Sequence, residues 1–180
     1  MRSGGERTLL AVLSNPPLTD GIRTLRRVHL AANLLGFEEA AVANLFAFPS
    51  HSTGAIATLG ATPEGWTAAR PQLQASLDQS GSVLLAYGST PPTGPARHNF
   101  YAQVEWLHHH LSALGTPTWQ VGDGPRHPSR WQRWTCRAHP GLTFSEALRV
   151  SLVRPTDEAS LGSLAYCQEA PPPASQEGRH

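Results

Sequence analysis

Mostly apolar runs occur four times along the chain, each ending at proline, glycine or small polar residues. The runs lie at residues 8–13, 40–48, 82–88 and 118–121. Short apolar runs are typical of strands that are buried on both faces of a sheet. Between them, apolar residues recur at every third or fourth position, which is typical of helices with one buried face. The pattern therefore predicts that strands and helices alternate along the chain.

Three helices are predicted between these strands, over residues 22–35, 67–79 and 97–114. The first has an apolar stripe made of Ile22, Leu25, Val28, Ala32 and Leu35. We expect Pro71 to break the second helix early, because proline removes a backbone donor. Residues 49–66 are rich in Ser, Thr, Gly and Pro, so we expect a long loop with at most one helical turn. Thr143 with Glu146 fits a capping box and predicts one more short helix.

Alternation of strands and helices predicts an α/β fold with a central four-stranded parallel sheet and helices on both faces, a three-layer sandwich. A chain of 180 residues suits one domain, which we place at residues 8–153. The ends at 1–7 and 156–180 are polar or rich in Pro, Ser and Glu, and we expect them to be flexible tails.

Charge and hydropathy exclude several classes of protein. The net charge of +1 gives no overall field that would draw the protein to nucleic acid or membrane, so any such binding needs a local patch. The first residues contain no apolar signal core. No apolar run approaches the roughly 20 residues that a membrane helix requires. We therefore expect a soluble, cytoplasmic, monomeric protein with no membrane partner.

Histidine and cysteine are not placed in metal-binding patterns. Cys136 and Cys167 match no metal or redox spacing. His108, His109 and His110 are adjacent on a predicted helix, so their side chains diverge and cannot share one metal ion. We expect the three histidines to lie on the surface, and we expect neither a metal nor a cofactor.

Polar residues stand where three of the predicted strands end. Asn15 follows the first run, Asn44 lies within the second, and His127 lies in the loop that follows the fourth. Ligands of α/β sheets bind just beyond the carboxyl ends of the strands. We therefore expect these three residues to surround one pocket. Asn44 needs partners if it is buried, either backbone groups of a loop or the amide edge of a ligand.

The loop around His127 has an unusual composition. Two glycines and two prolines within residues 122–131 argue against regular structure there. The segment 126–137 contains no acidic residue and four arginines, namely Arg126, Arg130, Arg133 and Arg137. Guanidinium groups in such a cluster are typical of phosphate binding. The alternative is a surface turn whose tryptophans pack on the body of the domain.

Several short motifs together carry a family resemblance. They are Asn15-Pro16, Thr24-Leu25-Arg26-Arg27, Gly36-Phe37, Asn44-Leu45-Phe46-Ala47, Tyr87-Gly88 and Pro125-Arg126-His127-Pro128. In order and spacing, over roughly residues 9–131, the chain resembles the bacterial and phage domain-of-unknown-function family 1643. Pro17-Leu18 stands where that family usually has small Ser-Thr residues. The family name itself implies no activity.

A more distant likeness, carried by Asn15-Pro16, Asn44 and His127-Pro128-Ser129, is to the uracil-DNA glycosylase superfamily. That resemblance implies a four-stranded parallel sheet and a pocket for a nucleobase. It implies catalytic roles for Asn15 and His127 and a base-reading role for Asn44. Phe46 or Phe48 would stack on the base, and Arg126, Arg130 and Arg133 would hold phosphates.

Two hypotheses remain open from the sequence. The first is a glycosylase-like hydrolase that cleaves a nucleobase N-glycosidic bond in DNA or a nucleotide; the His127 loop favours it. The second is a non-catalytic nucleotide- or nucleic-acid-binding domain, which the lack of an acidic residue beside Asn15 favours, because asparagine is no general base. A serine hydrolase that uses Ser129 and His127 is disfavoured, since no Gly-x-Ser-x-Gly motif is present.

Overall fold

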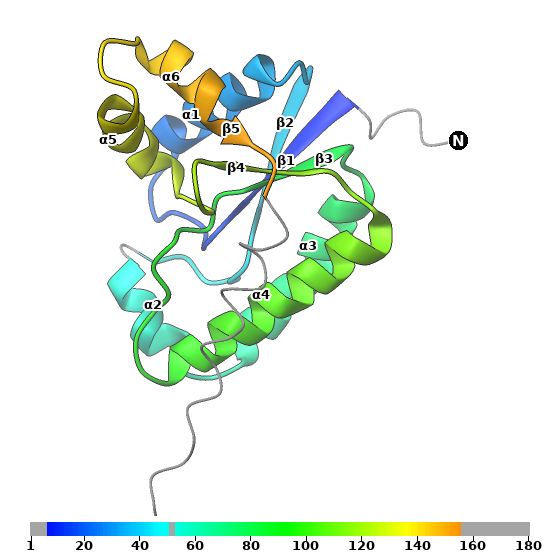
Figure 1. The fold of residues 1–180 in the computed structure, drawn as a ribbon. Helices are drawn as coiled ribbons and strands as arrows, with labels where there is room; N and C mark the ends of the chain where they lie inside the picture. Colours follow the sequence, from blue (N-terminus) through cyan, green and yellow to red (C-terminus); the bar gives the residue numbers. More distant parts are fainter. Residues whose placement is uncertain (1–6, 51–52, 156–180) are drawn as a thin grey trace, which may run out of the picture.

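The computed structural model describes residues 7–50 and 53–155, and strands and helices alternate along them (Figure 1). The strands are β1 (Thr8–Leu13), β2 (Glu39–Asn44), β3 (Ser82–Leu85), β4 (Thr118–Val121) and β5 (Leu152–Val153). The helices are α1 (Ile22–Leu34), α2 (Thr53–Leu59), α3 (Glu64–Asp78), α4 (Pro95–Leu114), α5 (Pro128–Ala138) and α6 (Phe144–Ser151). The predicted α/β class is confirmed. Of the tails expected at 1–7 and 156–180, all residues except Arg7 lie outside the described residues.

The sheet is mixed and has five strands in the order β2-β1-β3-β4-β5. The first four strands run parallel, with β1 between β2 and β3. β5 runs antiparallel to β4, where Leu152 pairs with Val121 and Val153 with Gln120. The prediction of an all-parallel sheet of four strands is therefore wrong in one respect, because a fifth, antiparallel strand is added next to β4. Two residues are too few to leave a periodic pattern in the sequence.

Alternate residues of β1 face two separate apolar clusters, as the two-residue period of a strand requires. Leu10 and Val12 belong to the cluster beneath α3 and α4, whereas Leu9 and Ala11 belong to the cluster beneath α1, α5 and α6. Figure 1 shows these two sets of helices on opposite sides of the sheet. Burial on both faces explains why the strand reads as an uninterrupted apolar run.

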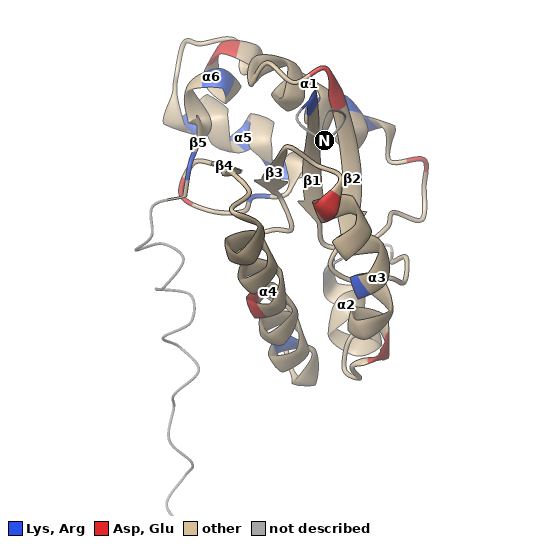
Figure 2. Cartoon of the chain, turned by 90° about the vertical axis from the view of Figure 1, so that its right-hand side faces the viewer, with Lys and Arg blue, Asp and Glu red and all other residues tan. Residues whose placement is uncertain are grey.

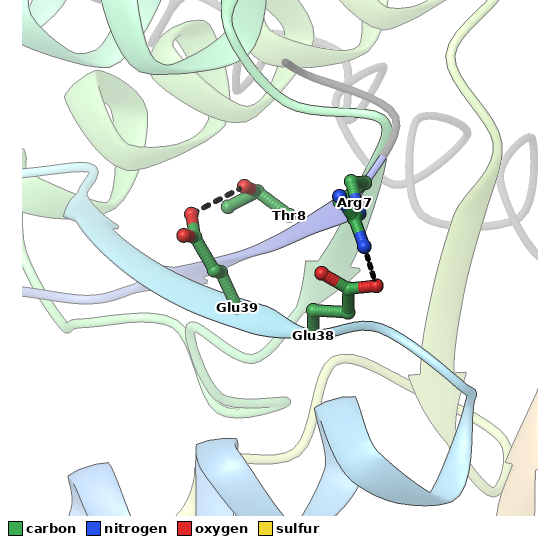
Figure 3. Close-up of polar contacts among 4 residues, drawn as sticks. All are labelled: Arg7, Thr8, Glu38 and Glu39. Atoms are coloured by element: carbon green, nitrogen blue, oxygen red, sulfur yellow. Dashed lines mark hydrogen bonds and ion pairs between the residues drawn. The ribbon is translucent and has the colours of Figure 1, made fainter. Parts of the chain in front are cut away.

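At the amino ends of β1 and β2, the polar side chains pair with one another (Figure 3). Arg7 forms an ion pair with Glu38. The Thr8 hydroxyl donates to Glu39 Oε2 at 3.2 Å, across a register in which Thr8 and Glu39 are opposed. At this end of the sheet, these four side chains therefore satisfy one another.

Two loop predictions are wrong. The segment 49–66 contains α2 and the first turn of α3. The α3 helix also begins before residue 67 and runs through Pro71, which lies inside it. Its buried residues Trp66, Leu73 and Leu77 pack in the core on one face of the sheet, and this packing outweighs the backbone hydrogen bond that Pro71 removes.

Candidate functional site

A cavity of about 900 Å³ lies at the carboxyl ends of the parallel strands. We call it the arginine cavity, because Arg126, Arg130, Arg133 and Arg137 line it. In the sheet, β2 lies on one side of β1, and β3, which follows β2 in the chain, lies on the other side of β1. The loops after β1 and β3 therefore diverge, and such a switch in strand order leaves a crevice where α/β proteins bind ligands.

The structure brings most of the predicted site residues to this cavity. Its lining includes Asn15 after β1, Asn44 at the end of β2 and His127 after β4, together with the arginines. It also includes residues that the sequence did not single out as site residues, namely Ser14, Asp20, Ser50, Tyr87 and Ser89. Loop residues of this kind carry no periodic signal, and only the fold places them together.

Asn15 is bonded through both ends of its carboxamide. Its Nδ2 donates to Ser50 Oγ at 2.9 Å and to the carbonyl of Pro16 at 3.0 Å. Its Oδ1 accepts a hydrogen bond from Ser14 Oγ at 3.0 Å. The side chain thus ties the loop after β1 to the loop after β2, where Pro17 and Ser50 also form an isolated bridge.

Asn44 is placed differently. Its Oδ1 is buried and has no hydrogen-bond partner among the described residues. This oxygen therefore does not bond to the loop backbone that the sequence offered as one partner. A buried carbonyl oxygen without a donor is destabilising by about 1–3 kcal/mol, so a ligand with an N–H group would gain there. Because no hydrogen bond holds the Oδ1 atom in place, rotation about χ2 would turn the Nδ2 donor to this position instead.

Phe46 and Phe48 do not line the arginine cavity. Phe46 is fully buried in the core, with its ring 4.8 Å from that of Trp66. Phe48 is 45% exposed and contacts the edge of Phe46. The base-stacking role expected of these two residues is thus not supported by their positions. Leu25 and Ile22, expected to be inward-facing, are instead exposed on the first turn of α1, and Leu25 lines the cavity.

His127 is the N-cap residue of α5, and its Nδ1 accepts the backbone N–H of Ser129 at 3.2 Å. Because Nδ1 acts as an acceptor, the ring proton resides on Nε2. Burial lowers the pKa of His127, and the charges of Arg130 and Arg27 lower it further. At neutral pH the ring is therefore uncharged and offers one N–H donor.

The expectation of irregular structure throughout residues 122–131 is wrong from Pro128 onward, where α5 begins. Proline suits the first helical position because its missing N–H would have no partner there. Trp131 is fully buried and donates from Nε1 to the carbonyl of Arg126 at 2.6 Å. Arg27 donates to the carbonyl of Pro128 at 2.8 Å. Both contacts fix the loop that carries His127.

Arg130, Arg133 and Arg137 follow each other at intervals of three and four residues, which places them along one side of α5, whereas Arg126 precedes the helix. The α5 helix contains no acidic residue, and Figure 2 shows it with blue positions only. Within the described residues, Arg126 pairs with Asp123 and lies over the ring of Trp134 at 4.8 Å. Arg130, Arg133 and Arg137 form no ion pair in the described part of the chain.

A second cavity of about 520 Å³, which we call the tyrosine cavity, lies on the other side of the loop after β3. Its walls include Tyr87, Phe100, Tyr101, Val104 and His108. The expectation that the histidine triplet lies on the surface is met by His109, whereas His108 and His110 are partly buried. The sequence marked Tyr87 only as part of a short motif. Tyr87, Gly88, Ser89 and Arg126 line both cavities.

Across residues 7–50 and 53–155, no three His, Cys, Asp or Glu side chains are grouped so that they could hold a metal ion. Cys136 is exposed and free, and Cys167 lies outside the described residues. None of the helices described in the structure has the length and apolar character needed to span a membrane.

Comparisons with known proteins give a family and no activity. No curated protein matches the chain, and no solved structure does. A family model described as a protein of unknown function (DUF1643) matches residues 3–129, which is more than half of the 180 residues. The chain therefore belongs to the DUF1643 family.

Proposed function

We propose that the protein binds a nucleotide or a nucleic-acid strand in the arginine cavity. One observation carries this proposal: the unpaired carbonyl oxygen of Asn44 belongs to a cavity that is lined by four arginines and by a single carboxylate, Asp20. A base edge and a phosphate are the two chemical groups that such a lining complements.

The charge of the cavity supports the phosphate part of the proposal. Arg130, Arg133 and Arg137 are exposed on α5, and no acidic partner neutralises them within the described residues. Guanidinium groups bind phosphate oxygens through two parallel hydrogen bonds and keep their charge at any physiological pH. A phosphate between two of these arginines would relieve their mutual repulsion.

Asn44 supports the base part. A carboxamide offers one acceptor and two donors, so it can pair with both the donor and the acceptor on the amide edge of a base. Asn15 lines the same cavity but is committed to Ser50 and Ser14, so it positions the loops instead. Asn44 is thus the base-reading residue of the proposed site.

Titration of thymidine 5′-monophosphate into the wild-type protein and three variants tests this proposal. We expect Arg133→Ala and Asn44→Ala to weaken binding about tenfold each, the size of one charge-assisted or well-placed hydrogen bond. Arg149→Ala is the matched control, because Arg149 is exposed on α6 and lines neither cavity. Equal affinity of all four proteins, or no binding to the wild type, would contradict the proposal.

Hydrolysis of an N-glycosidic bond is a second candidate, favoured by the neutral His127 with its Nε2–H donor. In such a reaction the oxygen of water bonds to the sugar carbon while the bond from carbon to base nitrogen breaks. The electron pair leaves with the base, where a hydrogen bond from Nε2–H would stabilise the developing oxyanion. The proton of water must pass to a base, and Asp20 is the one carboxylate on the cavity lining.

A screen for base release from oligonucleotides that contain uracil, hypoxanthine, xanthine or alkylated bases tests this second candidate. We expect His127→Asn to keep the cap of α5, since asparagine is a good N-cap residue, and to bind the strand while losing base release. His127→Ala should lose release and also melt at a lower temperature. Absence of base release from every strand by the wild type rules out hydrolysis of these bases and leaves the binding function.

A further inference from the structure

The tyrosine cavity has no role in the proposed function so far, yet it has the properties of a binding site. Its volume of about 520 Å³ lies within the range of small-molecule sites. Most of its surface is apolar, and Phe100 packs edge-to-face against Tyr87 and Tyr101 at 6.0 and 5.6 Å between ring centroids. Aromatic walls of this kind suit a planar ring.

Two polar groups of this cavity are poorly satisfied by each other. The hydroxyl of Tyr87 lies 3.5 Å from His108 Nε2, at the outer limit of a hydrogen bond. Burial raises the pKa of Tyr87 and lowers the pKa of His108, so both side chains are uncharged at neutral pH. A carbonyl or ring nitrogen of a ligand would offer the Tyr87 hydroxyl a better acceptor. The pair therefore suits the polar edge of a heterocycle.

The two cavities meet at a residue without a side chain. Gly88 has a φ of +97°, and a Cβ built on it would meet nothing within 4 Å. Gly88 and Ser89 line both cavities, and so does Arg126, whose Nε is buried without a partner among the described residues. A chain that passes from one cavity to the other would thus cross open space beside a guanidinium group.

The two cavities differ in the charge of the residues that line them. The tyrosine cavity is lined by Glu105 and Asp123, and Arg126 is the one arginine on its lining. Because Asp123 is paired with Arg126, Glu105 leaves the lining with a net negative charge, which disfavours a phosphate inside this cavity but does not repel a neutral ring. The phosphates of a ligand should therefore stay on the side of Arg126 that faces α5.

We propose that the tyrosine cavity holds the base of the nucleotide next to the one in the arginine cavity, so that the ligand is a dinucleotide unit or a strand. This inference rests on the proposed function and names its substrate class. The phosphate that links the two nucleotides would pass Gly88 and contact Arg126. Because a phosphodiester joins the two nucleotides, the second base binds at a high effective concentration once the first is bound.

Calorimetric titration of thymidine 5′-monophosphate and of the 5′-phosphorylated thymidine dinucleotide tests the inference. Two variants are matched: Ser112 and Ala113 are consecutive exposed residues of α4, and only Ser112 lines the cavity. For the wild type and Ala113→Trp, we expect the dinucleotide to bind at least about tenfold more tightly than the mononucleotide. For Ser112→Trp, whose indole would obstruct the cavity, we expect the two affinities to be equal.

Equal affinity of the two ligands for the wild type, or an undiminished preference in Ser112→Trp, would overturn the two-base site and leave the proposed function standing. Failure of both ligands to bind the wild type would overturn the proposed function and the two-base site together. If Ser112→Trp does not fold, His108→Ala replaces it. The preference of the His108→Ala variant for the dinucleotide should be several-fold lower than that of the wild type. An unchanged preference would again overturn the two-base site.

Discussion

The two ends of the sheet differ in whether their polar side chains have bonding partners. At the amino ends of β1 and β2, Arg7 pairs with Glu38 and Thr8 bonds to Glu39. At the carboxyl ends, Asn44 has a buried oxygen without a partner among the described residues, and three arginines of α5 form no ion pair with any of those residues. The unpaired groups at the carboxyl end favour the proposal that a ligand binds there.

The loop that delivers the arginines offers the largest expected effect. Gly122 has a φ of +70°, and a Cβ there would lie 2.3 Å from the ring of Trp134. We expect Gly122→Ala to lower the free energy of unfolding by about 2–4 kcal/mol, because the left-handed backbone is strained and Trp134 must move. Urea denaturation measures the loss.

Gly88→Ala is the matched control for that change. Its φ is also positive, but no atom lies near the added methyl group, so only the backbone strain of about 1–2 kcal/mol applies. Equal losses for the two variants would show that Trp134 does not rest on Gly122, and the His127 loop would then lack the packing described above.

The next largest effect on stability is expected from replacing Asn15, in comparison with Asn44. Asn15→Ala removes the bonds to Ser50 and Ser14, and we expect the free energy of unfolding to fall by about 1 kcal/mol. Asn44→Ala removes an oxygen that has no partner within the described residues, so stability should stay within about 0.5 kcal/mol or rise. Thermal and urea denaturation of both variants make the comparison. A larger loss for Asn44→Ala would mean that Asn44 is a structural residue.

The smallest effect is a dependence of stability on pH. Burial lowers the pKa of both His127 and His108 in the folded state, with Arg130 and Arg27 adding to the shift of His127. The unfolded chain takes up protons as pH falls below about 6.5, whereas the folded protein resists them. Stability should therefore be greatest above that pH. It should decline as pH falls from the histidine pKa of the unfolded chain to the lower pKa of the folded protein.

Two substitutions separate the contributions to this decline. His127→Asn keeps an N-cap acceptor that does not titrate, and His108→Gln keeps a polar side chain in the tyrosine cavity. Each variant should lose less stability than the wild type between pH 7 and pH 5, measured by urea denaturation. Parallel pH profiles for all three proteins would contradict the assignment of neutral histidines.

Local physical rules account for what the sequence predicted correctly. The strand Thr8–Leu13 and the strand Thr118–Val121 are confirmed with their bounds, as is the capping box of Thr143 and Glu146. These features depend on burial patterns or on residues three positions apart. The sequence pattern does not indicate α5, because glycines and prolines precede it, although Pro128 is well placed at a helix start.

Long-range packing accounts for the rest. The sequence placed Asn15, Asn44 and His127 at strand ends, and the parallel order of the strands brings them to one cavity. It could not show that Ser50 satisfies Asn15, 35 residues away, while Asn44 stays unpaired. Nor could it show that Phe46 lies beneath Trp66, or that His108 reaches Tyr87, since both contacts join elements that are distant in the chain.

The salt dependence of binding to a single-stranded oligonucleotide tests the central claim most directly. Each phosphate contact releases counterions, so the slope of log affinity against log salt reports how many arginines engage the strand. Arg133→Ala should shallow that slope by about one unit and weaken binding equally for different sequences, whereas Arg149→Ala should leave the slope unchanged. If Arg133→Ala binds like the wild type at low salt and with the same slope, the arginine cavity does not hold nucleic-acid phosphates.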